Sequence, residues 1–213
     1  RTLQRQVYVS DRVKTMNESI YYNIDALHNA ISEGVQITFH YFEWVLDFSA
    51  QERICKRYRK DGALYQVSPW ALTWDDENYY MIAYDAASND IRHYRVDKME
   101  HISLTDARRE GQQMFHHQFN VAAYSRTVFG MFSGEEKTVR LRCENRFIGV
   151  IHDRFGSDIM VQKLDDAHFA VNVSVAVSPQ FFSWVFGLGG AVQIIEPDDV
   201  CISFRQQLQD MLK

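Results

Sequence analysis

The region from residue 35 to residue 104 constrains the fold most, because it carries no helical pattern. Short aromatic and β-branched runs recur there at 54–59, 64–74, 79–84 and 91–96. Turn-forming clusters separate these runs at 60–62, 75–78 and 85–90. The region begins with Val35, Ile37, Phe39 and Tyr41, which alternate with polar residues as in a half-buried strand. Four or five short strands without intervening helices predict a small antiparallel barrel of the SH3 or Sm kind.

A helix is predicted directly before this region. Residues 22–33 place Ile24, Leu27 and Ile31 at helical spacing, Asn23 is a candidate N-cap, and Gly34 stands where a C-terminal glycine belongs. The period of the hydrophobic pattern therefore changes from helix to strand at Gly34. This change predicts a connector helix region over residues 1–34 and the barrel over residues 35–104.

Residues 105–137 lack a clean period and are interpreted as a linker with some helix. After the linker the expected elements are strand 138–143, a helix near 145–153, strands 158–164 and 168–177, helix 179–187 and strand 191–195. Ser178 followed by Pro179 is typical of a helix start, and a last helix is expected after Pro197. The order βαββαβ predicts a ferredoxin-like domain over residues 138–213, so the fold class is α+β.

Composition limits the partners. The chain has 23 Lys and Arg against 28 Asp and Glu, a net charge of −5, so only a local basic face could meet nucleic acid. The 3 cysteines form no C-x-x-C pair, which argues against a disulfide framework and a zinc site and fits a reducing cytoplasm. Polar residues and Pro179 interrupt the uncharged stretch 167–195, so no membrane partner is expected.

The N-terminus opens on polar and charged residues and begins with Arg1 rather than Met. We therefore expect no signal peptide. A trimmed chain and a processed product would each explain the absence of Met, and a trimmed chain would lack an upstream domain.

A search for catalytic and metal-binding patterns returns little. His116 and His117 are the nearest approach to a metal site, and adjacent helical histidines rarely reach one ion. No G-x-S-x-G elbow is present, and no cysteine lies in a recognisable catalytic signature. We expect no catalytic residue, no metal and no cofactor, although a triad assembled from distant residues remains an open alternative.

One basic and aromatic cluster could bind an anion. It comprises Arg92, His93, Tyr94, Arg95 and Lys98, with Tyr79 and Tyr80 on the preceding strand. Such residues can hold phosphate and stack a base. On a strand His93 and Arg95 share one face, so only part of the cluster can line one pocket. A solvated edge strand with core tyrosines explains the same residues, and the basic stretch 52–60 raises the same two alternatives.

The segment from Val35 to Ile102 resembles the WYL domain family. The family triplet reads Tyr79-Tyr80-Met81 here and departs from the eponymous letters at its first and third positions. Residues 65–72 and 93–99 carry the flanking motifs at the expected spacings. The C-terminal segment resembles the WCX extension, through Trp184 in FFSWVFGLGG and the later Ile195-Glu196-Pro197. The leader IYYNIDALHNAI resembles the connector that follows an N-terminal winged helix in such regulators.

The resemblance implies the sensing part of a bacterial transcriptional regulator rather than an enzyme. It implies an Sm-like barrel that binds an anionic effector, a nucleotide or single-stranded nucleic acid, and relays occupancy to an N-terminal DNA-binding domain. It also implies a homodimer. Carried over residue by residue, the ligand-binding pocket comprises Ser68, Tyr80, His93, Arg95 and Lys98. Lys98 stands where arginine is commoner, which keeps the charge and loses bidentate geometry.

Two other functions compete with the sensor. A direct single-stranded nucleic-acid binding module would lose affinity steeply with salt, whereas a pocket for one small anion would show a shallow slope. An enzyme acting on nucleotides would need turnover that no motif indicates.

The resemblance yields a pH test for His93. If its imidazole contacts phosphate, protonation below the reference pKa of about 6.5 should tighten binding in mild acid. Measuring the affinity between about pH 5.5 and 8 checks this, and a constant affinity would count against the contact.

Overall fold

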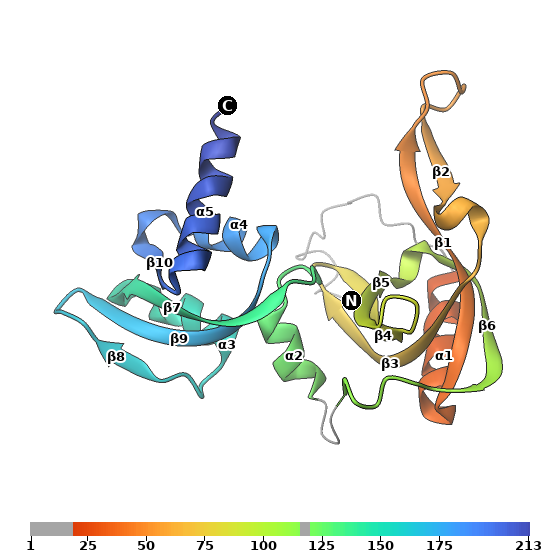
Figure 1. The fold of residues 1–213 in the computed structure, drawn as a ribbon, viewed down its shortest axis with the longest axis horizontal. Coiled ribbons are helices and arrows are strands. Elements are labelled where there is room, and N and C mark those ends of the chain that lie inside the picture. Colours follow the sequence, from red (N-terminus) through yellow and green to blue (C-terminus); the bar gives the residue numbers. More distant parts are fainter. Residues whose placement is uncertain (1–18, 116–119) are drawn as a thin grey trace, which may run out of the picture.

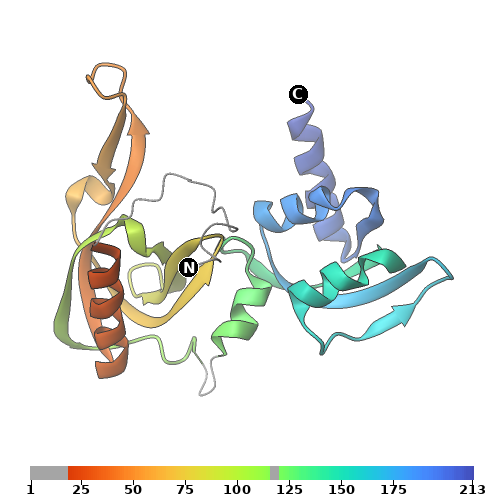
Figure 2. The same ribbon diagram turned by 180° about the vertical axis from the view of Figure 1, so that it is seen from behind.

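The computed structural model describes residues 19–115 and 120–213, which form two sheets joined by a short helical segment (Figure 1). The expectations for residues 1–18, and for His116 and His117, lie outside the described residues. Figure 2 shows the same two parts from behind. None of the helices in the described ranges combines the length and apolar character that a membrane crossing requires. The three cysteines are all free thiols.

The first sheet is antiparallel and curled (Figure 1). Its strands are β1 (Val35–Leu46), β2 (Ile54–Tyr58), β3 (Tyr65–Asp75), β4 (Asn78–Asp85), β5 (Asp90–Arg95) and β6 (Met99–Arg108), with the short 3-10 helices η2 (Arg59–Gly62) and η3 (Val96–Lys98). The strand order is β2-β1-β3-β4-β5, and β6 pairs with β1. Antiparallel pairing is confirmed. Within the described residues β5 and β6 do not pair with each other, so an Sm or SH3 barrel stays a prediction.

Aromatic rings fill the inside of this curled sheet. Phe39 is fully buried, lies 5.3 Å from Tyr65 in a stacked arrangement, and meets Tyr94 edge-on at 5.2 Å between ring centroids. The helix α1 (Ser19–Glu33) adds the fully buried Leu27 to the same cluster. Gly34 follows α1 with φ of +66°, the left-handed conformation that ends helices, so the expected change of period at this residue is confirmed.

The helix α1 begins earlier than expected, and Asn23 is therefore not its N-cap. Asn23 lies within the helix and its Nδ2 donates to Val96 O at 3.2 Å and to Met99 O at 2.8 Å. Val96 is the first residue of η3, and Met99 directly follows this turn. The amide thus fixes the turn that carries Lys98, a role that a cap-like residue type does not reveal in sequence.

The second sheet has the strand order β10-β7-β9-β8. Its elements are β7 (Glu135–Glu144), η4 (Asn145–Phe147), α3 (Ile148–Phe155), β8 (Val161–Lys163), β9 (His168–Val177), α4 (Pro179–Gly187), η5 (Gly189–Ala191), β10 (Val192–Glu196) and α5 (Asp198–Met211). This is the expected order βαββαβ followed by a helix. Ser178 caps α4, because its Oγ accepts a hydrogen bond from Phe181 N at 3.3 Å. The name ferredoxin-like stays a prediction.

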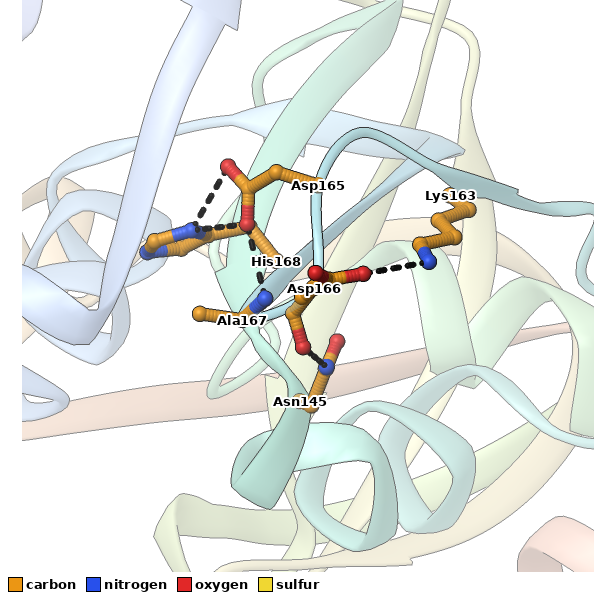
Figure 3. Close-up of polar contacts among 6 residues, drawn as sticks. All are labelled: Asn145, Lys163, Asp165, Asp166, Ala167 and His168. Atoms are coloured by element: carbon orange, nitrogen blue, oxygen red, sulfur yellow. Dashed lines mark hydrogen bonds and ion pairs between the residues drawn. The ribbon is translucent and has the colours of Figure 1, made fainter.

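Hydrogen bonds and ion pairs fix the turn between β8 and β9 (Figure 3). Asp165 accepts from Ala167 N at 2.8 Å and lies 2.8 Å from Nδ1 of His168. Lys163 pairs with Asp166 at 2.7 Å, and Asn145 donates to the Asp166 carbonyl at 2.8 Å. The aspartate–histidine pair is thus part of a turn that closes on itself, and the backbone bond to Ala167 lowers the pKa of Asp165.

The core of the second sheet gives a matched stability test within α4. Phe181 is fully buried, whereas Phe186 is 57% exposed five residues later. We expect Phe181→Ala to lower the free energy of unfolding by about 3–5 kcal/mol and Phe186→Ala by less than about 1 kcal/mol. Urea unfolding followed by circular dichroism measures both. Equal losses would show that α4 does not bury Phe181 in this core.

Candidate ligand-binding site

Three of the five predicted site residues come together at one end of the first sheet. Tyr80 on β4 is paired directly with Arg95 on β5, and Lys98 follows in η3. Burial lowers the pKa of Lys98, and the charge of Arg95 lowers it further. The same charge acts on the Tyr80 hydroxyl. Burial raises the pKa of Tyr80 and keeps this phenol protonated as a donor.

Arg95 is held on two sides. Its guanidinium forms a fork with Asp97, with Nε to Oδ1 at 3.0 Å and Nη2 to Oδ2 at 2.8 Å. Its backbone N donates to the Tyr41 hydroxyl at 3.1 Å. The bond to Asp97 raises the pKa of Arg95. An internal carboxylate thus occupies the bidentate geometry that suits a phosphate or carboxylate group.

A third cation lies at the same end of the sheet. Arg59 in η2 lies with its Nε 3.8 Å from Glu43 Oε2, and its charge also lowers the pKa of Lys98. We call Arg59, Arg95 and Lys98 the cationic cluster. Glu43 also accepts from Arg57 at 2.7 Å, so its charge is shared with a residue outside the cluster. The cluster is a local positive region in a chain of net charge −5.

Ser68 lies apart from the cationic cluster. It pairs with Tyr84, four residues along β4 from Tyr80, which is about 13 Å on an extended strand. Its Oγ is buried and accepts from Glu110 N at 2.9 Å. The hydroxyl therefore anchors the chain that leaves β6. Pro69, next to it, lies at a register shift of β3, as expected for a bend.

His93 points into the joint between the two parts of the chain. It shares a face of β5 with Arg95, but α2 (Val121–Thr127) covers it: its Nε2 lies 2.9 Å from the Tyr124 hydroxyl and its Nδ1 lies 3.5 Å from Ser133 Oγ. Burial lowers the pKa of His93 to about 4 and raises that of Tyr124 to about 12. A neutral imidazole of this kind gives no reason for tighter anion binding at about pH 5.5.

Four residues around the cluster carry no recognisable site motif in the sequence. Arg59 belongs to the basic stretch 52–60, so its charge was evident in the sequence, but its position next to Arg95 and Lys98 was not. Tyr41, Glu43 and Asp97 gave no signal in the sequence, because their roles depend on contacts between strands distant in sequence. No group of three His, Cys, Asp or Glu side chains that could hold a metal is found in the described ranges.

The structure thus defines a two-part α+β protein with a cationic cluster on its first sheet. The chain belongs to the WYL domain family: residues 22–104 match the WYL domain and residues 135–212 match the WCX domain. The resemblance seen in the sequence is confirmed. No curated protein matches this sequence.

Two solved structures are similar over most of this chain. Proteasome accessory factor B/C (PafBC) of Arthrobacter aurescens shares 19% identity with a TM-score of 0.35, over 94% of this chain and 28% of that one. A CRISPR Cas-related protein shares 13% identity with a TM-score of 0.49, over 91% of this chain and 52% of that one. The chain therefore spans 28% and 52% of the lengths of these two proteins.

The buried imidazole makes stability depend on pH. Since the folded-state pKa of His93 is lowered from 6.5 to about 4, the unfolded chain takes up the proton first on acidification. Its contribution is complete above pH 6.5 and is lost as the pH falls towards 4. We expect His93→Gln to flatten the dependence of melting temperature on pH in this window, relative to wild type. His152→Gln, at an exposed histidine, is the control and should leave the slope unchanged.

Proposed function

We propose that this chain is the ligand-sensing part of a bacterial transcriptional regulator. An anionic effector, a nucleotide or single-stranded nucleic acid, binds the cationic cluster and Tyr80. Occupancy is relayed to a DNA-binding domain that precedes residue 1. The observation that carries this proposal is the Arg95–Asp97 fork, an anion-binding geometry already built and partly buried. The WYL and WCX matches support a regulatory role rather than a catalytic one.

Binding proceeds by exchange at Arg95. A phosphate group replaces Asp97 on the Arg95 guanidinium. The positive charges of Lys98 and Arg59 attract this phosphate, and one of its oxygens accepts a hydrogen bond from the Tyr80 hydroxyl. Because Asp97 competes with the ligand, the site is tuned to weak or moderate affinity. The displaced carboxylate stays in contact with solvent, since its side chain is 20% exposed in the unliganded arrangement.

The relay starts on β5. Arg95 and His93 lie two residues apart on one face of this strand. A displacement of the Arg95 guanidinium therefore moves the strand and changes the contact between His93 and Tyr124. Ser68 and His93 then serve the sensor as anchors of the connecting segment, through Glu110 and Tyr124. A ligand that prefers one arrangement of this joint changes the populations of the two.

We further infer the finer fold names and the location. The strand order β10-β7-β9-β8 with βαββαβ connectivity supports a ferredoxin-like second domain, and the path β6-β1-β3-β4-β5 supports an Sm-like first domain. A cytoplasmic protein is consistent with three free thiols and with regulation of transcription.

The alternative is a module that binds single-stranded nucleic acid directly. Trp74 and Tyr79 form a cross-strand pair 4.6 Å apart, next to Tyr80 in sequence but on the opposite face of the sheet, and they are 55% and 40% exposed. Such rings could stack bases. The logarithm of affinity against salt distinguishes the two functions, because a strand crossing many cations gives a steep slope and one phosphate gives a shallow one.

A thermal-shift screen of the chain with mono-, di- and cyclic nucleotides and short oligonucleotides tests the site. We expect one ligand class to raise the melting temperature of the wild type, and Arg95→Ala to abolish that rise because the fork is lost. Asp97→Asn removes the competing carboxylate while keeping a polar side chain, so it should increase the rise.

Arg146→Ala is the matched control, since this arginine pairs with Glu144 at 2.7 Å in the second domain and should leave the response unchanged. A ligand response that survives Arg95→Ala would place the binding site elsewhere.

A further inference from the structure

Two buried polar atoms at the joint between the domains carry opposite charges and have no hydrogen-bond partner among the described residues. One is Oδ2 of Asp75, the last residue of β3, and the other is Nε of Arg154 on α3. Burial raises the pKa of Asp75, and the charge of Arg154 lowers it. The two side chains therefore act on each other across the joint without joining. An ion pair between them would satisfy both atoms at once.

The helix α2 brings these two residues to the same joint, since it contacts both β3 and α3 (Figure 1). In the first domain, Thr73 Oγ1 lies 3.2 Å from Ser125 Oγ of α2. Asp75 shares this face of β3 because it lies two residues further along the strand. In the second domain, Arg154 Nη2 donates to the Val128 carbonyl at the end of α2, at 2.9 Å. One arm of the guanidinium is thus anchored, while its Nε stays unpaired.

The candidate anion site lies on the same face of the first sheet. Thr73 is paired directly with Tyr80 on β4, and Tyr80 with Arg95 on β5, so Asp75, Tyr80 and Arg95 share this face. Burial raises the pKa of Tyr80, and the charge of Asp75 raises it as well, against the opposing charge of Arg95. A carboxylate that acts on the Tyr80 hydroxyl is equally subject to the charge of an anion bound there.

An anion beside Tyr80 makes the unliganded position of Asp75 less favourable. Like charges repel, and the repulsion is stronger between partly buried groups than in water. Arg154 offers the opposite charge on the side of Asp75 that faces the second domain. Movement of the carboxylate towards this guanidinium therefore relieves the repulsion and removes the cost of two unpaired buried atoms.

We propose that Asp75 and Arg154 form an ion pair between the two domains when an anion occupies the site beside Tyr80. The inference rests on the proposed function, because it supplies a route by which occupancy reaches the second domain. Arg154 also donates to the Val128 carbonyl. Formation of the pair therefore draws α3 and the end of α2 together towards the end of β3, and this changes how the domains meet.

A tethered anion tests the pair without any ligand. Tyr80→Glu places a carboxylate opposite Arg95, and Tyr80→Gln is its uncharged match. Spin labels at Ala87→Cys, in the exposed turn after β4, and at Met160→Cys, which is 87% exposed in the second domain, report the distance between the domains. All variants carry Cys55→Ser, and the other two cysteines are buried.

Electron–electron double resonance measures the distribution of this distance. We expect Tyr80→Glu to add a second distance and Tyr80→Gln to leave a single one. Asp75→Asn or Arg154→Gln should abolish the second distance in the Tyr80→Glu chain. A distribution that Tyr80→Glu leaves unchanged, or a second distance that survives Asp75→Asn, would overturn the proposal.

Melting temperatures supply a second measurement. In the wild type, the double variant Asp75→Asn with Arg154→Gln should lose less than the sum of the two single losses, because each charge acts on the other. The matched control replaces Asp75→Asn with Asp76→Asn, at the exposed neighbouring carboxylate, and its losses should add. Additive losses for Asp75 and Arg154 contradict the ion pair whether or not Tyr80→Glu folds.

These measurements separate the ion pair from the proposed function, because neither adds a ligand. If no nucleotide or oligonucleotide stabilises the chain, the proposed function fails and a second distance in Tyr80→Glu still supports the pair. If a ligand stabilises the chain and Tyr80→Glu gives no second distance, the site stands and the pair is wrong.

Discussion

The strand β1 is the element on which the rest of the first domain depends. It has 12 residues, and its first part pairs with both β3 and β6 whereas its last five residues pair with β2. Successive side chains along it serve different purposes: Phe39 fills the core, the Tyr41 hydroxyl holds Arg95, and Glu43 meets Arg59. Trp44 and Leu46 then leave the body of the domain. Core, binding cluster and projecting hairpin are therefore fixed by the register of one strand.

The electrostatics of the cationic cluster follow from partial burial. Three cations at one end of a sheet repel one another, and Glu43 and Asp97 offset part of this repulsion in the unliganded protein. The repulsion that these carboxylates do not offset is evident at Lys98, because burial and the neighbouring arginines together lower its pKa. A bound anion relieves the same repulsion. The conformation with the strongest repulsion in the unliganded protein is therefore the one that an anion stabilises most.

Local patterns in the sequence were sufficient for much of the fold. The change of period at Gly34, the Ser178-Pro179 helix start and the strand over residues 168–177 each depend on residues close in the chain, and each is present in the structure. The site was harder to predict. Alternation placed His93 and Arg95 on one face, but nothing in the aperiodic residues 105–137 indicated that α2 covers only one of them. Asn23 and Arg59 likewise depend on hydrogen bonds and charges that join distant segments.

The helix α2 belongs to both domains at once. Tyr124 and Ser125 bind the first domain through His93 and Thr73, while the next turn of chain presents the Val128 carbonyl to Arg154 of α3 and buries Phe129 in the second core. A segment held at both ends cannot behave as a tether of adjustable length. A change in the relative orientation of the two domains would therefore require the contacts at both ends of α2 to shift together.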